Sequence, residues 1–600
     1  MAKEEKLRCE IEDKYKWDLT KIYKDEKEWQ KDFDDVKEKI LKVLEYKDSF
    51  LSNGKKLYEY LKYDEEVSRK LEKIYYYAHL NYDADTLDEK YKVMTNKVSD
   101  LFTKYNELSS FVVPEILKLD EEKLNTFYKE EEKLEDYRFS IENIYRFKNH
   151  TLDEEKEKML SNLSKCLSNP EETYEALTDS DFEYDYITDE KGNKVKFNES
   201  NYSLFIKSKD RSVRKRAFEM LHNKYKKYIR TITSTYKGEV ENNVVLAKIR
   251  NYDSAISASL YSDNVPVDIY NNLIKVVNDN MNVLYDYYDF TKEILSLDRL
   301  HMYDTYVEII NKIDKKYSFD EAKEIVIDAL SVLGDKYVKN LKKAFDEKWV
   351  DYCSYKGKAS GAYCTSCYGA HPVVLTNFFG KFGDVSAVAH ELGHAVNFYL
   401  SQQANNKHDY NNDIFVAEVA SLTNEIILSN YVIEHSRNKN LKLIALYNLI
   451  NLIQNNLFDA CLEGELENKA YTLIDNGETI DAEYLSSTIY DIRSKYYKDV
   501  VNLDDKSKYS WIRREHYFYP FYLFKYATGV SAAIMIATKI INNEDDMKNK
   551  YISFLKMGDT DYPVELLKKI GIDMTKEEVY ENAVNFFSNL IDEFDKESDK

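Results

Sequence analysis

Apolar residues recur three and four positions apart along most of this chain, with lysine and glutamate between them. Two examples are EEVSRKLEKIYYYAHL at 65–80 and EAKEIVIDALSVL at 321–333. This spacing places the apolar side chains on one face of a helix, so each stretch is predicted to be an amphipathic helix. Only 15 glycines and 6 prolines occur in 600 residues, so the elements should be long and the turns few. The pattern predicts a mainly α protein.

Two segments interrupt the helical pattern. In EYDYITDEKGNKVKFNES at 183–200, apolar residues alternate around Lys191-Gly192-Asn193, which predicts a β-hairpin. A boundary near residue 200 would divide the chain into an N-terminal helical lobe, 1–200, and a second part, 201–600. The other interruption is KGKASGAYCTSCYGAHPVVLTNFFG at 356–380. Six of the fifteen glycines fall within 357–393, so short strands and turns, and a functional site, are expected there.

Charge and cysteine content narrow the class of protein. The net charge of −22 disfavours nucleic acid as a partner, because a polyanion would be repelled. The N-terminal residues carry charges where a signal peptide needs an apolar stretch, and VSAAIMIATKII at 530–541 is too short for a membrane span. Six cysteines in so long a chain do not form a disulfide framework. We therefore expect a cytoplasmic protein without a membrane partner.

The string His390-Glu391-Leu392-Gly393-His394 carries the clearest chemistry. Asp384 is a plausible N-cap for a helix over VSAVAHELGHAVNFYL, at 385–400. In a helix the two histidines project from one face, where their imidazoles can share a tetrahedral Zn²⁺, and Glu391 lies to the side, where it can take a proton from a zinc-bound water. Gly393 would leave room beside the metal. Two histidines can also be plain core residues, but histidine is scarce here, at 10 in 600.

A catalytic zinc site needs a third protein ligand. Asp413 can cap a second helix, IFVAEVASLTNEIILSNYVI at 414–433, in which Glu418 lies 24 residues after His394. An antiparallel helix pair would bring Glu418 beside the histidines and leave one position open for water or substrate. Glu425 lies two turns further along the same face and could fix the tautomer of a ligand histidine. One alternative is that Glu425, and not Glu418, is the third ligand. Another is that Glu425 is a solvated charge with no role in the site.

These segments resemble the zinc metallopeptidases of thimet oligopeptidase and oligoendopeptidase F, the latter more closely. The matching residues are AHELGHAVNFYL (389–400) and FVAEVASLTNE (415–425). Further similar segments are KWDLTKIY (16–23), AKIRNYDSAISASLYSDNVP (247–266), KGKASGAY (356–363) and HYFYPFYLFKYATG (516–529). The resemblance thus spans nearly the whole chain, and residues 1–200 would include the oligoendopeptidase F N-terminal region.

The resemblance implies a two-lobed, nearly all-helical body with a deep channel, and a small β element beside the zinc helix. It implies endopeptidase cleavage of oligopeptides, with His390, His394 and Glu418 as ligands of one Zn²⁺ and Glu425 as partner of a ligand. The strand with Ser360, Gly361, Ala362 and Tyr363 would bind substrate backbone. His516, Tyr519 and Tyr526 would donate hydrogen bonds to the developing oxyanion, with Tyr522 in reserve.

One departure from oligoendopeptidase F is the pair Cys364 and Cys367, where that family usually has small polar residues. Residues three apart in a strand face opposite sides, so joint metal binding would require a turn. No second cysteine pair completes a four-cysteine site, and His371 is the only nearby partner. We interpret the pair as incidental, with redox sensitivity as the alternative.

Together these observations predict a zinc metalloendopeptidase that hydrolyses internal bonds of short unstructured peptides. A zinc-bound water would be the nucleophile and Glu391 the general base, which then hands the proton to the leaving amine. One alternative is a catalytically silent protein with structural zinc or a peptide scavenger, in which Glu391 would be superfluous. An aminopeptidase is a closer alternative, but it usually has a shorter gap to the third ligand. The sequence does not fix the oligomeric state, and a monomer is slightly favoured.

Overall fold

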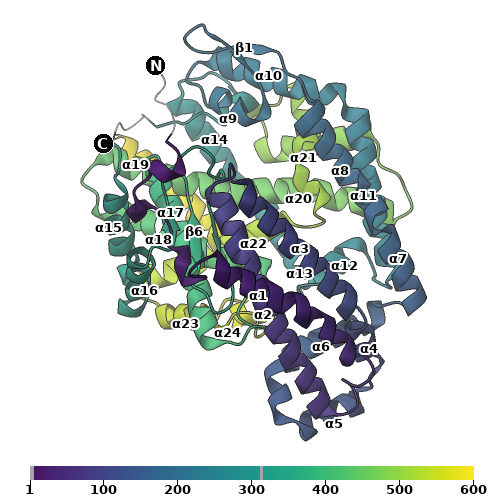
Figure 1. Cartoon of the computed structure of the whole chain (residues 1–600). Helices are drawn as coiled ribbons and strands as arrows, with labels where there is room; N and C mark the ends of the chain where they lie inside the picture. Colours follow the sequence, from purple (N-terminus) through teal and green to yellow (C-terminus); the bar gives the residue numbers. More distant parts are fainter. Residues whose placement is uncertain (1–5, 311–314, 412, 600) are drawn as a thin grey trace. The chain divides into compact units, whose positions relative to one another are not determined.

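A computed structural model describes residues 6–310, 315–411 and 413–599, and most of them are helical (Figure 1). The predicted mainly α class is confirmed. The chain forms two compact units, each assembled from three separate stretches. Unit 1 comprises residues 1–149, 315–431 and 536–572, and unit 2 comprises 150–314, 432–535 and 573–600. The predicted boundary near residue 200 and the channel between lobes stay predictions.

The helices of unit 1 include both long helices of the N-terminal region and the helices around the sheet. They are α1 (Glu26–Lys39), α2 (Gly54–Ala84), α3 (Glu89–Ser109), α4 (Val112–Lys118), α5 (Glu121–Glu130), α6 (Arg138–Arg146), α15 (Phe319–Ala329), α16 (Asp335–Asp346), α17 (Phe382–Ala404), α18 (Ile414–His435, whose last turn belongs to unit 2), α23 (Met547–Phe554) and α24 (Pro563–Lys569).

Short polar side chains define where the N-terminal helices begin. The carboxylate of Asp25 accepts the N–H groups of Lys27 and Glu28 at the start of α1. Asn53, Asp88 and Asp120 accept N–H groups in the same way at the starts of α2, α3 and α5. Such caps satisfy donors that the first turn of a helix leaves without partners, and each typically stabilises by about 1 kcal/mol.

A single hydrophobic core joins the N-terminal helices of unit 1 to its sheet. The indole of buried Trp29 on α1 donates to the carbonyl of Ile74 on α2 at 2.8 Å. The same cluster of buried apolar side chains extends to Cys367, Val373 and Leu375 of the glycine-rich segment. The short strands are therefore fixed by a core that the long helices supply, which positions the neighbouring helix α17.

The sheet of unit 1 has three strands in the order β4-β6-β5: β4 (Val350–Asp351), β5 (Tyr363–Thr365) and β6 (Val373–Leu375). The central strand β6 is fully buried. It runs parallel to β4 and antiparallel to β5. β5 is an edge strand that packs along α17. The prediction of short strands in the glycine-rich segment is confirmed.

Unit 2 consists of helices with two small pairs of strands. Its helices are α7 (Glu154–Leu167), α8 (Asn169–Glu175), α9 (Glu199–Ile206), α10 (Arg211–Lys227), α11 (Ile229–Ile249), α12 (Ala255–Tyr261), α13 (Val267–Asp279), α14 (Asn282–Ile294), α19 (Lys439–Ile453), α20 (Ala460–Asp475), α21 (Ala482–Tyr497), α22 (Phe524–Ile541, whose last residues belong to unit 1) and α25 (Glu577–Asp599). Helix α25 packs against α19, α13 and α14. One π-helical turn, Gln454–Asp459, joins α19 to α20.

The predicted hairpin is confirmed as β1 (Tyr186–Thr188) and β2 (Lys194–Lys196), which pair antiparallel. Gly192 adopts a φ of 84° in the connecting turn, a conformation that glycine tolerates best. The second pair joins β3 (Leu300–His301) to β7 (Val501–Asn502) in parallel.

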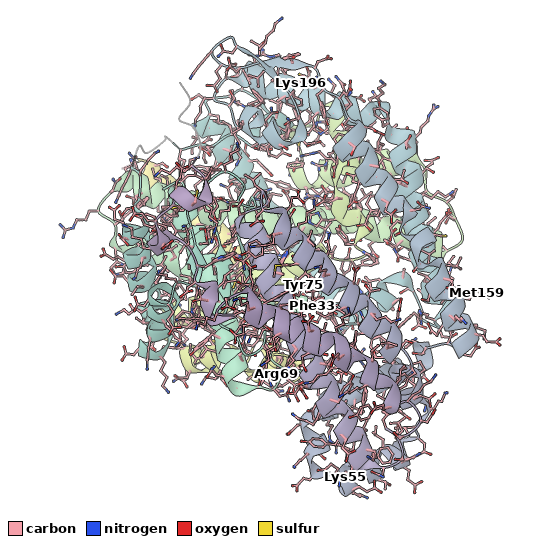
Figure 2. All side chains as sticks on the ribbon, in the orientation of Figure 1. Phe33, Lys55, Arg69, Tyr75, Met159 and Lys196 are labelled. Atoms are coloured by element: carbon pink, nitrogen blue, oxygen red, sulfur yellow. The ribbon has the colours of Figure 1, made fainter. Side chains whose placement is uncertain are left out.

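Charged side chains such as Lys55 and Lys196 lie exposed on the surface (Figure 2).

Helix α22 contains the apolar stretch 530–541. Among the described residues it is the one helix whose length and composition would allow it to cross a membrane, and 72% of it is buried within the molecule. Val530, Ala533 and Ile536 have no exposed surface. The core helix of a soluble protein has these same properties, as the sequence predicts for this stretch.

Candidate metal centre and active site

The helix with the two histidines begins earlier than predicted. Helix α17 starts at Phe382, so Asp384 lies inside its first turn rather than before it. The carboxylate of Asp384 accepts the N–H groups of Phe379 and Lys381 at 2.9 and 2.8 Å. The prediction of Asp384 as N-cap is wrong for this reason: the side chain caps from within the helix. The predicted cap of α18 is confirmed, because Asp413 accepts the N–H of Phe415 at 2.7 Å.

His390, His394 and Glu418 form the one group among the described residues whose side chains could together hold a metal ion. One ligand atom of each lies within 4.8 Å of the others. Nε2 of His390 is 3.4 Å, and Nε2 of His394 is 3.5 Å, from the same Glu418 oxygen. Two donors on a tetrahedral ion with bonds of about 2.0–2.1 Å are roughly 3.3–3.4 Å apart. The spacing of the three groups therefore fits a zinc ion.

Glu425 fixes the orientation of the first histidine. Its carboxylate accepts a hydrogen bond from Nδ1 of His390 at 2.8 Å, and its other oxygen accepts from the Ser386 hydroxyl at 2.7 Å. An ionised carboxylate only accepts hydrogen bonds, so Nδ1 must hold the proton, which leaves the lone pair on Nε2 facing Glu418. The sequence analysis predicted this contact, with Glu425 as the hydrogen-bond partner of a histidine in the cluster.

The electrostatics of the cluster favour a cation. Burial alone would lower the pKa of His390, but the hydrogen bond to Glu425 and the nearby carboxylates raise it to about 9. Burial would raise the pKa of Glu418, but its hydrogen bond and proximity to the histidines lower it to about 2. The Ser421 hydroxyl also donates to the facing Glu418 oxygen at 2.9 Å. The same negative field that raises the pKa of a buried imidazole would also attract a metal ion.

Glu391 lies between the histidines on α17 and is 6% exposed. Burial raises the pKa of its carboxyl group, an effect that the charges of His390 and His394 partly oppose. A raised pKa brings a carboxylate closer to the proton affinity that a general base needs near neutral pH. The role of Glu391 as general base stays a prediction.

Two hydrogen bonds of buried side chains connect α18 to α17 and α16, and the sequence analysis did not predict them. The side-chain amide of Asn424, which has no exposed surface, donates to the carbonyl of Ala389 at 2.9 Å. The hydroxyl of Tyr337, on α16, donates to the amide oxygen of Asn424 at 2.8 Å. An asparagine in the apolar part of a predicted helix was the available signal, because a buried amide requires partners.

Gly393 serves helix packing. A Cβ atom built at this position would lie 2.7 Å from both the Ala420 carbonyl oxygen and the Ser421 Cα of α18. The glycine thus lets the two helices approach closely enough for Glu418 to meet the histidines, whereas the sequence was interpreted as leaving room next to the metal. The close contact between α17 and α18 therefore explains why residue 393 is a glycine.

We expect Gly393→Ala to separate the two helices and damage the cluster. Forcing a methyl group into this contact should destabilise the protein by about 1–3 kcal/mol. Because Glu418 would move away from the histidines, metal affinity should fall as well. Thermal unfolding and metal titration of the variant measure the two effects, with Gly383→Ala as control, since a Cβ there meets nothing within 4 Å. Equal metal affinity in the two variants would contradict the role given to Gly393.

The predicted substrate strand begins later than the sequence suggested. Ser360, Gly361 and Ala362 precede β5, which starts at Tyr363. Gly361 has a φ of 82°, outside the strand conformation, and its carbonyl accepts from the Asn377 side chain at 2.9 Å. Among the described residues no further strand pairs with β5, so the strand edge that could bind an extended peptide runs along Tyr363–Thr365. The prediction that Gly361 and Ala362 contact substrate backbone stays a prediction.

Cys364 and Cys367 are free thiols in buried surroundings. Cys364 lies in β5, and burial raises its pKa well above the ordinary value, with the Glu391 carboxylate acting in the same direction. Burial raises the pKa of Cys367 to about 12, and this residue belongs to the core that joins the sheet to the N-terminal helices. Thiols with so little thiolate react slowly, which favours the interpretation of the pair as incidental.

The C-terminal motif gathers its aromatic rings in unit 2. The imidazole of His516 lies 6.4, 6.0 and 6.1 Å, between ring centroids, from Tyr519, Tyr522 and Tyr526. Burial and the nearby Arg514 lower the pKa of His516, and its Nδ1 has no hydrogen-bond partner among the described residues. Tyr519 is 43% exposed, and a hydrogen bond to Glu171 raises its pKa. The metal cluster belongs to unit 1.

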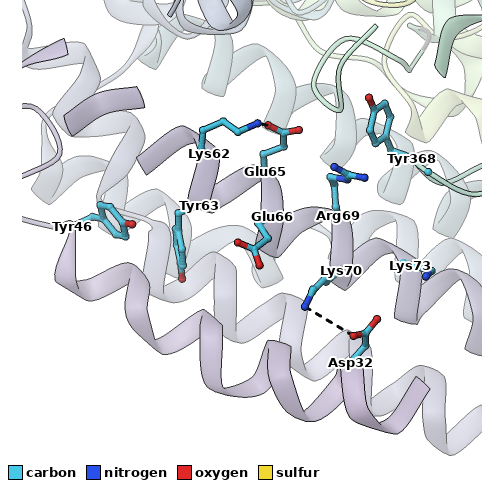
Figure 3. Close-up of a pocket in the computed structure, with 11 residues that line it drawn as sticks. Asp32, Tyr46, Lys62, Tyr63, Glu65, Glu66, Arg69, Lys70, Lys73 and Tyr368 are labelled. Carbon is cyan, nitrogen blue, oxygen red and sulfur yellow. Dashed lines mark hydrogen bonds and ion pairs between the residues drawn. The ribbon is translucent and has the colours of Figure 1, made fainter. Parts of the chain in front are cut away.

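A separate surface pocket of about 730 Å³ lies in unit 1 among α1, α2 and the turn at Tyr368 (Figure 3). Its charged groups largely pair with one another: Lys62 with Glu65 at 2.6 Å, and Lys70 with Asp32 at 3.9 Å. None of the predicted site residues lines it. The hollow is therefore distinct from the candidate metal centre.

A mainly helical scaffold with two histidines, a convergent glutamate and a buried glutamate between the histidines defines the site of a metal-dependent hydrolase. The family model described as Peptidase family M3 matches residues 204–586, and the Oligopeptidase F model matches residues 115–184. The chain belongs to peptidase family M3, whose members are metallopeptidases.

Similar proteins cover the chain nearly end to end. It is 33% identical to oligopeptidase PepF of Bacillus subtilis (strain 168), over 99% of this chain and 90% of that protein. It is 34% identical to an oligoendopeptidase F homolog of Borreliella burgdorferi, over 98% of this chain and 99% of that protein. The crystal structure of oligoendopeptidase-F from Enterococcus faecium is similar with a TM-score of 0.76 and 29% identity, covering 96% of this chain and 99% of that one. That of a candidate peptidase from Chlamydophila abortus has a TM-score of 0.93 and 33% identity, covering 99% and 100%.

These findings confirm the predicted family and the peptidase class. The roles given to individual residues stay predictions, which the geometry makes specific.

Proposed function

We propose that this protein is a zinc-dependent endopeptidase that cleaves internal peptide bonds of short, unstructured oligopeptides. The observation that carries the proposal is the convergence of His390, His394 and Glu418 at tetrahedral spacing, with all three side chains partly exposed. The relatives named as oligoendopeptidases support the same class of substrate. Oligopeptides are the partners proposed, and neither nucleic acid nor a membrane is part of the proposal.

Zinc held by these three residues would polarise the scissile carbonyl and make water more acidic. Glu391 would take the proton of the attacking water and then deliver it to the leaving amine. Its burial raises the pKa of its carboxyl group, which favours both transfers. Glu425 would hold the His390 ring in the orientation that the cluster requires.

His516, Tyr519 and Tyr526 would donate hydrogen bonds to the oxyanion that develops on the scissile carbonyl. Burial keeps His516 neutral near pH 7, so it can donate from one nitrogen, and a tyrosine hydroxyl is a neutral donor at this pH. The hydroxyl of Tyr519 is hydrogen-bonded to Glu171, a contact that competes with the role proposed for Tyr519. Substrate backbone would lie along the free edge of β5, next to Gly361 and Ala362.

The proposed location is the cytoplasm, and the proposed form is a monomer. All six cysteines are free thiols, which suits a reducing compartment. Size-exclusion chromatography with light scattering of the purified protein would test the monomer.

A defined peptide library tests the proposed activity. The purified protein is incubated with the library alone, with a chelator, and with a chelator followed by zinc, and mass spectrometry identifies the cut sites. We expect cuts inside the peptides, loss of cleavage with chelator, and recovery with zinc. Folded proteins in the same mixture should stay intact. Release of terminal residues only, or cleavage that resists the chelator, would contradict the proposal.

Tyr526→Phe removes one hydroxyl group and should leave zinc content and peptide binding nearly unchanged. If that hydroxyl meets the oxyanion, kcat should fall by about 10²–10³-fold, as for other oxyanion donors. A role in positioning the substrate would instead raise KM and leave kcat nearly intact. Steady-state kinetics on one fluorogenic peptide separate the two, and Tyr509→Phe serves as a control outside the motif.

A further inference from the structure

The segment with His516 and Tyr526 is held by buried groups of unit 2 that the proposed chemistry does not use. It comprises a short 3₁₀ helix, Glu515–Phe518, an extended turn, and the start of α22. Within the turn, Phe521 is fully buried and has a φ of 53°. A bulky residue in this left-handed region costs free energy, of order 1–3 kcal/mol, and persists only where its surroundings impose it.

Helix α20 supplies one side of the support. Glu463 and Glu467 lie one turn apart on the same face, and they are 4% and 1% exposed. The carboxylate of Glu467 accepts the backbone N–H of Phe521 at 2.7 Å, and that of Glu463 accepts the hydroxyl of Tyr517. Buried carboxyl groups are costly without such partners, so their contacts to the segment are specific features of the fold.

The electrostatics of the two glutamates differ. Glu463 is paired with the buried guanidinium of Arg493 at 3.1 Å. Glu467 has no ion-pair partner among the described residues, and burial raises its pKa to about 8, an effect that the Phe521 N–H partly opposes. The contact to the N–H of Phe521 is the one hydrogen bond of the Glu467 side chain among the described residues.

Helix α12 and the turn after it supply the other side. The Ser259 hydroxyl donates to the carbonyl of Pro520 at 2.8 Å, and Asp263 pairs with Lys525 at 2.5 Å. Both residues belong to the segment AKIRNYDSAISASLYSDNVP, which contains no group used in the proposed chemistry. Two consecutive backbone groups, the Pro520 carbonyl and the Phe521 N–H, are thus bound by side chains from different helices.

We propose that Glu467, together with Ser259, is a positioning residue that holds the turn at Pro520–Phe521 and so places the donors His516 and Tyr526 for the reaction. The inference rests on the proposed function of these donors. The rings of His516 and Tyr526 lie on either side of the turn in sequence, with centroids 6.1 Å apart, so the turn sets their relative position. A shift of about 1 Å in such groups is enough to cost up to 10²-fold in rate.

Two substitutions at Glu467 test this role. Glu467→Met keeps the volume but removes the acceptor, so kcat should fall by about 10–100-fold while KM and zinc content change little. Glu467→Gln keeps an acceptor oxygen and should restore most of kcat. Glu465→Met is the matched control on the same helix, because Glu465 binds Asn278 and Tyr496 instead of the segment. It should lower the melting temperature without lowering kcat.

The decisive measurement combines Glu467→Met with Tyr526→Phe. If Glu467 acts through the donors, the two losses in kcat should be less than multiplicative. Losses that multiply fully, or an unchanged kcat in Glu467→Met, would overturn the inference and leave the proposed function intact. A normal kcat in Tyr526→Phe alone would instead remove the oxyanion role and the inference with it. If Glu467→Met does not fold, Ser259→Ala replaces it in the same cycle, with the same two outcomes.

Discussion

Glu391→Gln should lower kcat by about 10⁴-fold while the protein keeps its metal. The substitution preserves the size and the helix, but an amide cannot take a proton from water, so the contribution of a general base is lost in full. None of the three convergent groups is altered, because Glu391 is separate from the cluster of His390, His394 and Glu418. Kinetics on a fluorogenic peptide and elemental analysis of the purified variant measure the two quantities.

The control for this experiment is Glu434→Gln, the same exchange at an exposed glutamate on α18. It should leave kcat and metal content unchanged. A variant Glu391→Gln that keeps activity within about tenfold would mean that another group accepts the proton. A variant that loses its metal would assign Glu391 to the cluster instead.

Replacement of the histidines should abolish activity by removing the metal. His390→Ala with His394→Ala deletes two of the three convergent groups, so the double variant should hold no stoichiometric zinc and show no cleavage above background. The fold should persist, because the cores of both units are large and independent of an ion. Metal analysis after dialysis and circular dichroism check the two statements.

Two glutamate exchanges then separate a ligand from its partner. Glu418→Gln removes a charged donor atom and should lose the metal on dialysis. Glu425→Gln keeps a group that can accept from Nδ1 of His390, so affinity should fall by only about 10–100-fold. If Glu425→Gln loses zinc and Glu418→Gln keeps it, the third ligand has been assigned wrongly.

Local sequence patterns predicted the helices and the cluster because both depend on short spacings. His390 and His394 share a face at four residues' separation in any helix. Glu418 and Glu425 followed from one assumption, that two consecutive helices pack antiparallel. The start of α17 was misjudged by a few residues, because Asp384 caps its own helix from the third position.

The remaining parts of the site depend on contacts between distant residues. Gly393 is explained only by the backbone of Ala420 and Ser421 on another helix. The later start of strand β5 involves Asn377, whose side chain donates a hydrogen bond to the carbonyl of Gly361. Glu467 meets Phe521 across 54 residues, and in a chain with 108 acidic residues no local pattern distinguishes it.

The π-helical turn Gln454–Asp459 before α20 is a place where a relative could be one residue shorter without a change of orientation in α20. A π-helical turn accommodates one residue more than an α-helical turn. Deletion of a single residue there would convert it to a regular α-helical turn, so the residues beyond it would keep their orientation relative to α19, whereas the same deletion within a regular α-helix would rotate them by about 100°. Glu463 and Glu467 would therefore still face Tyr517 and Phe521. Among relatives, an alignment gap of one residue at 454–459 is therefore expected to leave these two contacts in place.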